Sequence, residues 1–425
     1  MAFSYLIQTY TLKIFSIFAC MAQAINLKPF RDFFRSEQIG GIILIFSVFV
    51  SLSIANSAVG VGFENLLDVK LGYSSSSLDL EYSLSQWIND GLMAIFFLLI
   101  GLEIKREIIE GELSSPRKAS MPIFAAIGGM FLPAGIYFIF NSNLETTSGW
   151  GIPMATDIAF ALGILSLLGK RVPASLKVFL AALAIVDDLG AILVIAIFYT
   201  NELHWLQLLY SAGILALLIG MNYWGVKRLF FYIIPGLFLW YFIHHSGIHA
   251  TIAGVLLALT IPSNPVKKTS PLEHLEHLIV RPVNFLIMPI FALANTNIRF
   301  ENKMLDGLTS PLGLGIIFGL VIGKPLGVTL FSWIAVKSGL ATLPSRASWK
   351  HIFGLGLLAG IGFTMSIFIA LLSFSNPDHK IEAKFSILLA SILAGVSGFI
   401  FLLSLNKKRK RRIRKARISS QRKIA

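Results

Sequence analysis

The chain has 425 residues, of which 55% are hydrophobic and only 14% are charged. Soluble globular chains carry about 25% charged residues, so this composition excludes a soluble protein and indicates a polytopic membrane protein. The net charge of +14 does not predict a nucleic-acid partner, because the excess is concentrated in one C-terminal run, KKRKRRIRKAR.

Residues 1–27 are interpreted as an N-terminal extension. Residues 1–24 are largely apolar and end in AQA, which resembles a signal-peptide cleavage site, but no positively charged segment precedes them. A cleaved leader, a retained extension and a start codon upstream of a true start at Met21 all stay open. The single cysteine, Cys20, excludes an intramolecular disulfide framework and a cysteine-based metal or redox site.

Apolar segments follow along the rest of the chain, and several are shorter than the ~20 residues of a simple span. They lie near 39–58, 84–103, 119–140, 151–169, 176–199, 204–221, 229–244, 247–261, 278–297, 312–332, 352–374 and 384–405. The predicted fold is therefore an all-α polytopic membrane protein with about 12 transmembrane helices in one domain, residues 28–405.

The distribution of lysine and arginine predicts that both termini are cytoplasmic. With that orientation, the outside loops hold only Lys70, Arg299, Lys303, Lys380 and Lys384 of the 36 basic residues. Inside loops of membrane proteins carry the excess of positive charge. We expect the basic tail, residues 406–425, to lie against anionic lipid headgroups.

The first outside loop reads VKLGYSSSSLDLEY and has a hairpin pattern over residues 69–82, because apolar residues alternate on both sides of a serine-rich turn. An isolated two-stranded hairpin is marginally stable in water, so pairing with a second subunit in a homodimer is a reasonable hypothesis. A flexible loop is the alternative.

Two spans contain helix-interrupting residues. Span four reads GWGIPMATDIAFALG, with Pro153 four residues before Asp157, and span eleven reads GLGLLAGIGFTMSIFIA. Glycines in membrane helices also permit close packing, but proline and glycine together predict interrupted helices whose freed backbone groups line a cavity. Spans three to five match spans ten to twelve in kind and lie seven spans apart, which predicts inverted-topology repeats around a site at the midplane.

The deeply placed charges are Asp157 in span four, Asp187 and Asp188 in span five, and Lys324 in span ten. An ionised carboxylate at the centre of a span costs roughly 2.5 to 3.5 kcal/mol on insertion scales, so such residues usually face the protein interior and carry function. A buried Asp187–Lys324 pair that only joins two helices is the alternative, but it leaves two acids unexplained.

Carboxylate oxygens suit hard cations such as Na⁺ and Li⁺, and Thr156 adds a hydroxyl group beside Asp157. Burial and a neighbouring carboxylate both favour protonation, and a close pair titrates as a unit. The same oxygens of Asp187 and Asp188 can therefore hold a proton or a metal ion. Competition for one site, combined with alternating access, is sufficient for exchange.

The segments ATDIAFALG, LAIVDDLGAI, GLEIKRE, SGIHATIAG, LIVRPV, IGKPLG and GIGFTMSIFIA together resemble the NhaA-type sodium/proton antiporters, from about residue 28 to 404. These antiporters are themselves among the known examples of inverted repeats. The resemblance implies a secondary transporter, not an enzyme, that uses no cofactor. It further implies electrogenic export of Na⁺ or Li⁺ driven by inward H⁺ across the bacterial inner membrane.

The resemblance also implies roles for individual residues. Asp187 and Asp188 would bind the metal ion and carry protons. Asp157 would offset the N-terminal dipoles of the interrupted helices, while Lys324 would offset their C-terminal ends or pair with Asp187.

Activation at alkaline pH is implied as well, through a cytoplasmic cluster that matches Glu103, Arg106, Glu276 and His277. A second histidine that related chains carry close to His277 is absent here, where the sequence continues LIVRP. Two further residues are less constrained. His249 matches another position linked to the pH response or has a structural role, and Asp90 has no assigned task.

Two other classes fit the residues less well. An intramembrane aspartyl protease would use membrane aspartates, but its usual YD and GxGD contexts are missing, since the acids here stand in ATD and IVDD. An ion channel has little use for two interrupted helices and a titrating pair. Sodium flux in sealed vesicles would separate an exchanger from a channel.

Overall fold

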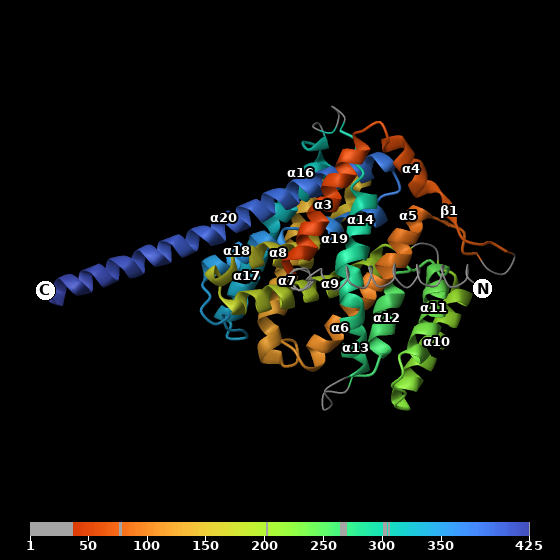
Figure 1. Ribbon diagram of the computed structural model, residues 1–425, viewed down its shortest axis with the longest axis horizontal. Coiled ribbons are helices and arrows are strands. Elements are labelled where there is room, and N and C mark those ends of the chain that lie inside the picture. The colour runs from red at the N-terminus through yellow and green to blue at the C-terminus, as the bar shows by residue number, and fades with distance from the viewer. Residues whose placement is uncertain are drawn as a thin grey trace, which may run out of the picture.

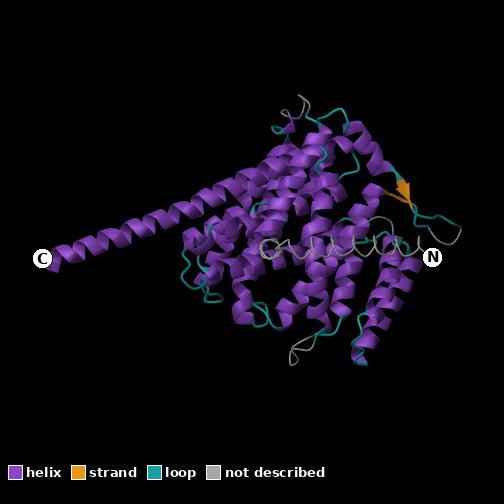
Figure 2. Cartoon of the chain, viewed as in Figure 1, coloured by secondary structure: helices purple, strands orange, loops and turns teal. Residues whose placement is uncertain are grey.

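The computed structural model describes residues 37–75, 79–200, 203–263, 270–300, 304 and 307–424, with side chains considered up to residue 405. The expected N-terminal extension, residues 1–27, lies outside the described residues. Within them the chain is almost entirely helical, with one short two-stranded ribbon (Figure 2).

The elements follow one another in chain order as shown in Figure 1. They are α3 (Glu37–Ala55), α4 (Gly60–Asp68), β1 (Lys70–Leu71), β2 (Tyr82–Ser83), α5 (Leu84–Gln86), η1 (Trp87–Leu92), α6 (Met93–Ile109), α7 (Pro116–Asn141), η2 (Glu145–Met154), α8 (Ile158–Leu167), η3 (Gly169–Arg171), α9 (Ala174–Phe198), α10 (Trp205–Tyr223), α11 (Phe230–His244), α12 (Ile252–Thr260), α13 (Pro271–Pro282), η4 (Val283–Ile287), α14 (Met288–Asn295), α16 (Pro311–Phe318), η5 (Gly319–Gly323), α17 (Lys324–Lys337), α18 (Trp349–Ala359), α19 (Phe363–Ser373) and α20 (Pro377–Ile424).

Among the described residues, six helices are long and apolar enough to cross a membrane, or nine if each of three bent helix pairs is one span. The chain is therefore an all-α, multi-pass membrane protein. The expected number of twelve spans stays a prediction.

Two of the three bent pairs contain the glycine- and proline-rich segments of the sequence. The axes of η2 and α8 differ by 42°, and those of α18 and α19 by 49°. Ordered 3₁₀ helix begins at Glu145, ahead of the apolar segment predicted near residues 151–169.

A 3₁₀ helix of ten residues is unusually long, and bonds from other helices explain how η2 persists. The Tyr137 hydroxyl of α7 donates to the Thr146 carbonyl at 2.6 Å. The Ser366 hydroxyl of α19 donates to the Ile152 carbonyl at 2.7 Å. Carbonyl groups that are poorly hydrogen-bonded within the 3₁₀ helix thus accept hydrogen bonds from neighbouring helices.

Helices α7 and α17 approach each other through glycines. A Cβ atom at Gly128 would lie 2.2 Å from the Gly327 carbonyl oxygen, and one at Gly327 would lie 2.0 Å from the Gly128 oxygen. Small residues allow such backbone contact between membrane helices. Lys324 begins α17 one turn before Gly327 and directly follows the π-helical segment η5, so this contact fixes the depth of the lysine.

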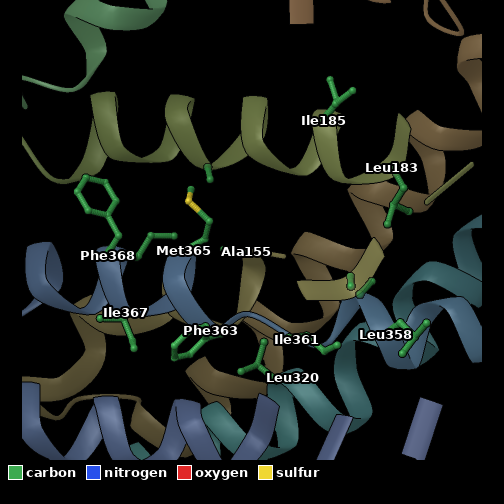
Figure 3. Close-up of a cluster of buried hydrophobic side chains, with 14 of the residues drawn as sticks. Ala155, Leu183, Ile185, Leu320, Leu358, Ile361, Phe363, Met365, Ile367 and Phe368 are labelled. Atoms are coloured by element: carbon green, nitrogen blue, oxygen red, sulfur yellow. The ribbon is translucent and has the colours of Figure 1, made fainter. Parts of the chain in front are cut away.

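The core lies where α9 and the two bent pairs meet. Figure 3 shows the side chains of Met365 and Phe368 pointing from α19 toward α9, with Ala155 and Ile361 at the breaks of the two bent pairs. All four residues are buried. The two breaks are therefore enclosed by apolar side chains.

The loop between α4 and α5 forms the expected hairpin, although the hairpin is short. Strands β1 and β2 pair antiparallel, with Leu71 opposite Tyr82, and an isolated bridge joins Ser74 to Asp79. Burial, followed by the charge of Asp79, raises the pKa of Tyr82 to about 12. Its hydroxyl therefore stays protonated at physiological pH, and it lies 3.3 Å from Nε2 of His245, next to the end of α11.

Helix α20 continues past the helical bundle to Ile424 and extends away from it (Figure 1). Residues 406–424 of the predicted basic tail form the distal part of this helix.

Candidate functional site

Asp157 lies between the N-termini of two helices. It is the N-cap of α8, where Oδ1 accepts a hydrogen bond from the Phe160 amide at 3.0 Å. Its Oδ2 accepts bonds from the amide of Thr364, at 3.2 Å, and from the hydroxyl of the same residue, in the first turn of α19. Helix N-termini carry partial positive charge and unpaired amide groups. The single carboxylate of Asp157 therefore compensates the N-termini of both α8 and α19.

The C-terminal ends of η2 and α18, the first helices of the two bent pairs, meet at the same place, which we call the crossing. The Lys324 ammonium donates to the Met154 carbonyl at the end of η2. The Thr156 hydroxyl contacts the Ala359 carbonyl, at the end of α18, at 2.8 Å. The backbone joins the two pairs directly, since the Asp157 amide donates to the Ile361 carbonyl at 2.7 Å.

Asp187 of α9 contacts this crossing through one oxygen. Its Oδ2 lies 2.7 Å from Nζ of Lys324 and 2.8 Å from the Thr156 hydroxyl. Its other oxygen, Oδ1, is buried and has no hydrogen-bond partner among the described residues. Lys324 therefore contacts both Asp187 and a helix C-terminus, so the two expected contacts of this lysine coexist.

Asp188 is buried without compensation. Its side chain is 1% exposed, and it forms no hydrogen bond or ion pair with any described residue. The charges that act on it are those of Asp187, Glu103 and Asp157, all negative, and of Lys324. An unpaired carboxylate in a low-dielectric interior is costly unless it is neutralised.

A proton or a cation would each remove that cost. Three oxygens are candidates to ligate a cation, namely Oδ1 of Asp187, a carboxylate oxygen of Asp188 and the hydroxyl of Thr156. Hard monovalent cations take such oxygen ligands. Among the described residues, no group of three or more His, Cys, Asp or Glu side chains is placed to hold a metal ion.

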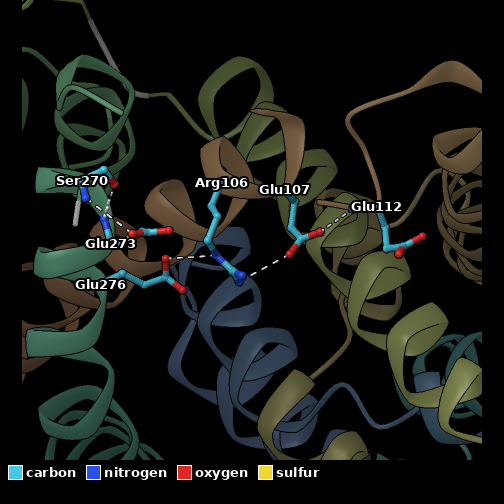
Figure 4. A network of polar contacts seen from close by, with 6 residues as sticks. All are labelled: Arg106, Glu107, Glu112, Ser270, Glu273 and Glu276. Atoms are coloured by element: carbon cyan, nitrogen blue, oxygen red, sulfur yellow. Dashed lines mark hydrogen bonds and ion pairs between the residues drawn. The ribbon is translucent and has the colours of Figure 1, made fainter. Parts of the chain in front are cut away.

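The predicted cluster of Glu103, Arg106, Glu276 and His277 lies elsewhere, at the C-terminal end of α6 and on α13. Figure 4 shows Arg106 and Glu276 from this cluster. Nε of Arg106 lies 3.1 Å from the Glu276 carboxylate of α13, and its Nη2 lies 3.4 Å from Glu107. The charge of Glu276 acts on Glu103, and the charge of Glu103 acts on Asp188. Glu103 is thus the one member of this cluster, among the described residues, with an electrostatic connection to the acid pair.

The two histidines occupy different environments. His277 makes no hydrogen bond or ion pair with the described residues, although its charge acts on Glu276. His249 lines a cavity of about 590 Å³, with Asp90 and Phe368. Its Nδ1 lies 3.9 Å from Oδ1 of Asp90, which is too long for a hydrogen bond.

Several groups at the crossing were not predicted from the sequence. Thr364 could have been found, because it follows the GIGF break as Thr156 and Asp157 follow the other break. Ser391 of α20 accepts a hydrogen bond from the Phe363 amide at 3.1 Å, and no sequence signal pointed to it. The carbonyls of Met154 and Ala359 also became visible only in the fold.

Buried carboxylates beside two bent helices in a membrane bundle, one of them without a partner among the described residues, define the class of ion-coupled secondary transporters. The chain belongs to the Na⁺/H⁺ antiporter 1 family, whose pattern matches residues 31–402. The resemblance seen in the motifs is thus confirmed, and the family is one of transporters, not enzymes.

Individual relatives match over nearly their whole length. The chain is 64% identical over 391 residues to the Na⁺/H⁺ antiporter NhaA 2 of Flavobacterium johnsoniae, covering 92% of this chain and 96% of the relative. It is 51% identical over 375 residues to NhaA 1 of the same organism, covering 88% and 96%. It is also 51% identical over 383 residues to the Na⁺/H⁺ antiporter NhaA of Yersinia enterocolitica, covering 89% and 98%.

Proposed function

We propose that the chain exports Na⁺ or Li⁺ in exchange for H⁺, and that Asp187 and Asp188 bind the metal ion and the protons in alternation. The observation that carries the proposal is the pair of buried carboxylates, of which Asp188 has no partner among the described residues. Family membership and the printed names of the relatives support the choice of ions.

Asp157, Thr156 and Lys324 support the site. Asp157 compensates the N-termini of α8 and α19, and Lys324 compensates the end of η2 and holds one oxygen of Asp187. When a cation approaches Asp187, it competes with Lys324 for that carboxylate. Two acids can bind more than one proton for each Na⁺ that they release, and such unequal exchange moves net charge across the membrane. We therefore propose that the exchange is electrogenic.

The two bent pairs are proposed to be interrupted membrane spans, within twelve spans arranged as inverted repeats. The order long helix, bent pair, long helix occurs in residues 116–198 and again in 311–405, which supports this reading. Alternating exposure of the acid pair to the two sides would then arise from movement of the crossing.

Activation at alkaline pH is proposed to involve the cluster of Glu103, Arg106, Glu276 and His277. Its contacts link α6 to α13, and Glu103 provides an electrostatic connection to Asp188. His249 is a separate candidate at the cavity of about 590 Å³.

Residues 28–405 are proposed to form one antiporter domain in the bacterial inner membrane, with both termini in the cytoplasm. The basic tail, residues 406–425, would contact anionic lipid, and hairpins 69–82 of two copies would pair in a homodimer. The transported Na⁺, Li⁺ and H⁺ are the ligands, with no separate cofactor and no nucleic acid.

The test is dye-monitored Na⁺/H⁺ exchange in everted membrane vesicles with Asp188→Asn. We expect exchange to be lost while the amount of folded protein is unchanged, because the amide can neither release a proton nor neutralise Na⁺. Asp378→Asn, at an exposed aspartate, is the matched control and should exchange normally. Retained exchange in Asp188→Asn would remove Asp188 from the mechanism, and Na⁺ flux without H⁺ movement would indicate a channel.

A further inference from the structure

The N-terminus of α19 is compensated by side chains of other helices. Its N-cap is Gly362, which has no side chain, whereas the N-cap of α8 is Asp157. The first amide groups of a helix have no acceptor within the helix. The Thr364 amide donates to the Asp157 carboxylate at 3.2 Å. The Phe363 amide donates to the hydroxyl oxygen of Ser391, in α20, at 3.1 Å.

Ser391 lies where α20 packs against the break between α18 and α19, and its side chain is buried. In Figure 3 the side chains of Ile361 and Phe363 lie on the side of this break away from α9. One turn beyond Ser391, a Cβ atom at Gly395 would lie 3.4 Å from Cδ1 of Ile361 and 3.0 Å from Cδ1 of Ile164, in α8. Because α20 contacts both bent pairs there, Ser391 is held in place while it accepts the α19 amide.

The break that precedes α19 carries two of the bonds that form the crossing. The Ile361 carbonyl accepts a hydrogen bond from the Asp157 amide at 2.7 Å. The Ala359 carbonyl contacts the Thr156 hydroxyl, which lies 2.8 Å from Oδ2 of Asp187. A shift at the start of α19 would therefore reach the oxygens of the ion site through the backbone of the break.

Ser391 occupies a place in the second half of the chain that an acid occupies in the first half. Asp187 follows the N-cap of α8 by nearly as many residues as Ser391 follows the N-cap of α19, and each lies in the long helix after its bent pair. Both side chains bond to a break segment. The serine can therefore position the crossing, but it brings no charge that would neutralise a cation.

We propose that Ser391 is a positioning residue, whose hydroxyl group holds the start of α19 so that the oxygens of Thr156 and Asp187 keep the spacing that a cation needs. The inference rests on the proposed exchange of Na⁺ for H⁺. A cation site needs several ligands held within about 0.5 Å of the productive geometry, whereas a proton binds one carboxylate oxygen. A displaced break should therefore weaken Na⁺ binding more than proton binding.

Ser391→Ala removes the acceptor of the Phe363 amide. We expect the KM for Na⁺ in everted vesicles to rise by roughly five-fold, the scale of one hydrogen bond, while the exchange rate at saturating Na⁺ changes little. Ser391→Thr keeps the hydroxyl group and should retain the native KM. Ser397→Ala is the matched control, because the Ser397 hydroxyl donates to the Ala394 carbonyl of the same helix.

Two measurements on the purified protein do not depend on transport. Calorimetry should give a Kd for Na⁺ that is raised by a similar factor in Ser391→Ala, and hydrogen exchange of the amides in residues 361–366 should become faster than in the native chain. Ser391→Cys keeps the size of the side chain but offers only a weak acceptor. Its Kd should lie between those of the native and alanine chains, and it replaces the alanine variant if that variant does not fold.

A native KM and a native Kd in Ser391→Ala would overturn the proposal. A lower melting temperature without any change in Na⁺ affinity would overturn it as well, because the serine would then have a structural role alone. Absence of Na⁺/H⁺ exchange in the native chain would instead overturn the proposed function, and hydrogen exchange at the start of α19 would still test the contact.

Discussion

Asp157 compensates the partial positive charge at the N-termini of α8 and α19, the second helices of the two bent pairs. Its second oxygen accepts hydrogen bonds from the amide and the hydroxyl group of Thr364. Thr364→Val removes the hydroxyl donor and should lower the free energy of unfolding by about 1–3 kcal/mol, the usual cost of removing a hydrogen bond to a charged or buried group. Thermal unfolding in detergent measures this, with Thr364→Ser as the control that keeps the donor. Equal melting temperatures for the Val and Ser variants would contradict the role given to the hydroxyl.

Lys324 is the only cation that acts on the acid pair among the described residues. Lys324→Ala leaves Asp187 and the Met154 carbonyl without their donor, and breaking a buried ion pair costs about 3–5 kcal/mol. We expect a lower melting temperature and a shifted pH profile of exchange. Lys337→Ala, at the exposed end of the same helix, is the control. An unchanged melting curve for Lys324→Ala would argue against a structural role for this charge.

These residues show which parts of the site a sequence can reveal. Asp157, Asp187, Asp188 and Lys324 were predictable because charge inside an apolar span is costly and needs a reason. Their partners were harder to predict, because the Met154 and Ala359 carbonyls become available only where a helix ends in three dimensions.

At the scale of elements, the contact between α7 and α17 determines where Lys324 lies. Gly128→Ala would place a methyl group 2.2 Å from the Gly327 oxygen, and relief of such overlap typically costs about 1–3 kcal/mol. Gly135→Ala, on the same helix, meets no atom within 4 Å and should be neutral or slightly stabilising, because alanine favours helix. Comparison of the two melting temperatures measures the effect. Equal destabilisation by both would contradict the proposed contact.

Helix boundaries were less predictable than helix existence. The apolar pattern located α9 and α10 closely, because their ends coincide with changes in hydropathy. It missed the start of η2 at Glu145, since that segment is held by hydroxyl groups of α7, α9 and α19 and has no periodic pattern of its own.

At the scale of the whole molecule, composition alone indicated a multi-pass helical membrane protein, because only such a chain carries so few charges. The motifs indicated the family, and the comparisons confirmed it. The pairing of Leu71 with Tyr82 was foreseeable from alternation. The crossing of the two bent pairs was foreseeable only as a pattern of breaks, because the bonds from residues 156–157 to residues 359–364 join segments some 200 positions apart.

The central claim is that Na⁺ and H⁺ compete for the carboxylates of Asp187 and Asp188. It is tested most directly by calorimetry of Na⁺ binding to the purified chain in buffers of different ionisation enthalpy, which counts the protons released. The account predicts proton release that increases as the acids become protonated at lower pH, and its loss in Asp188→Asn. Sodium binding to the native chain that releases no protons at any pH would contradict it.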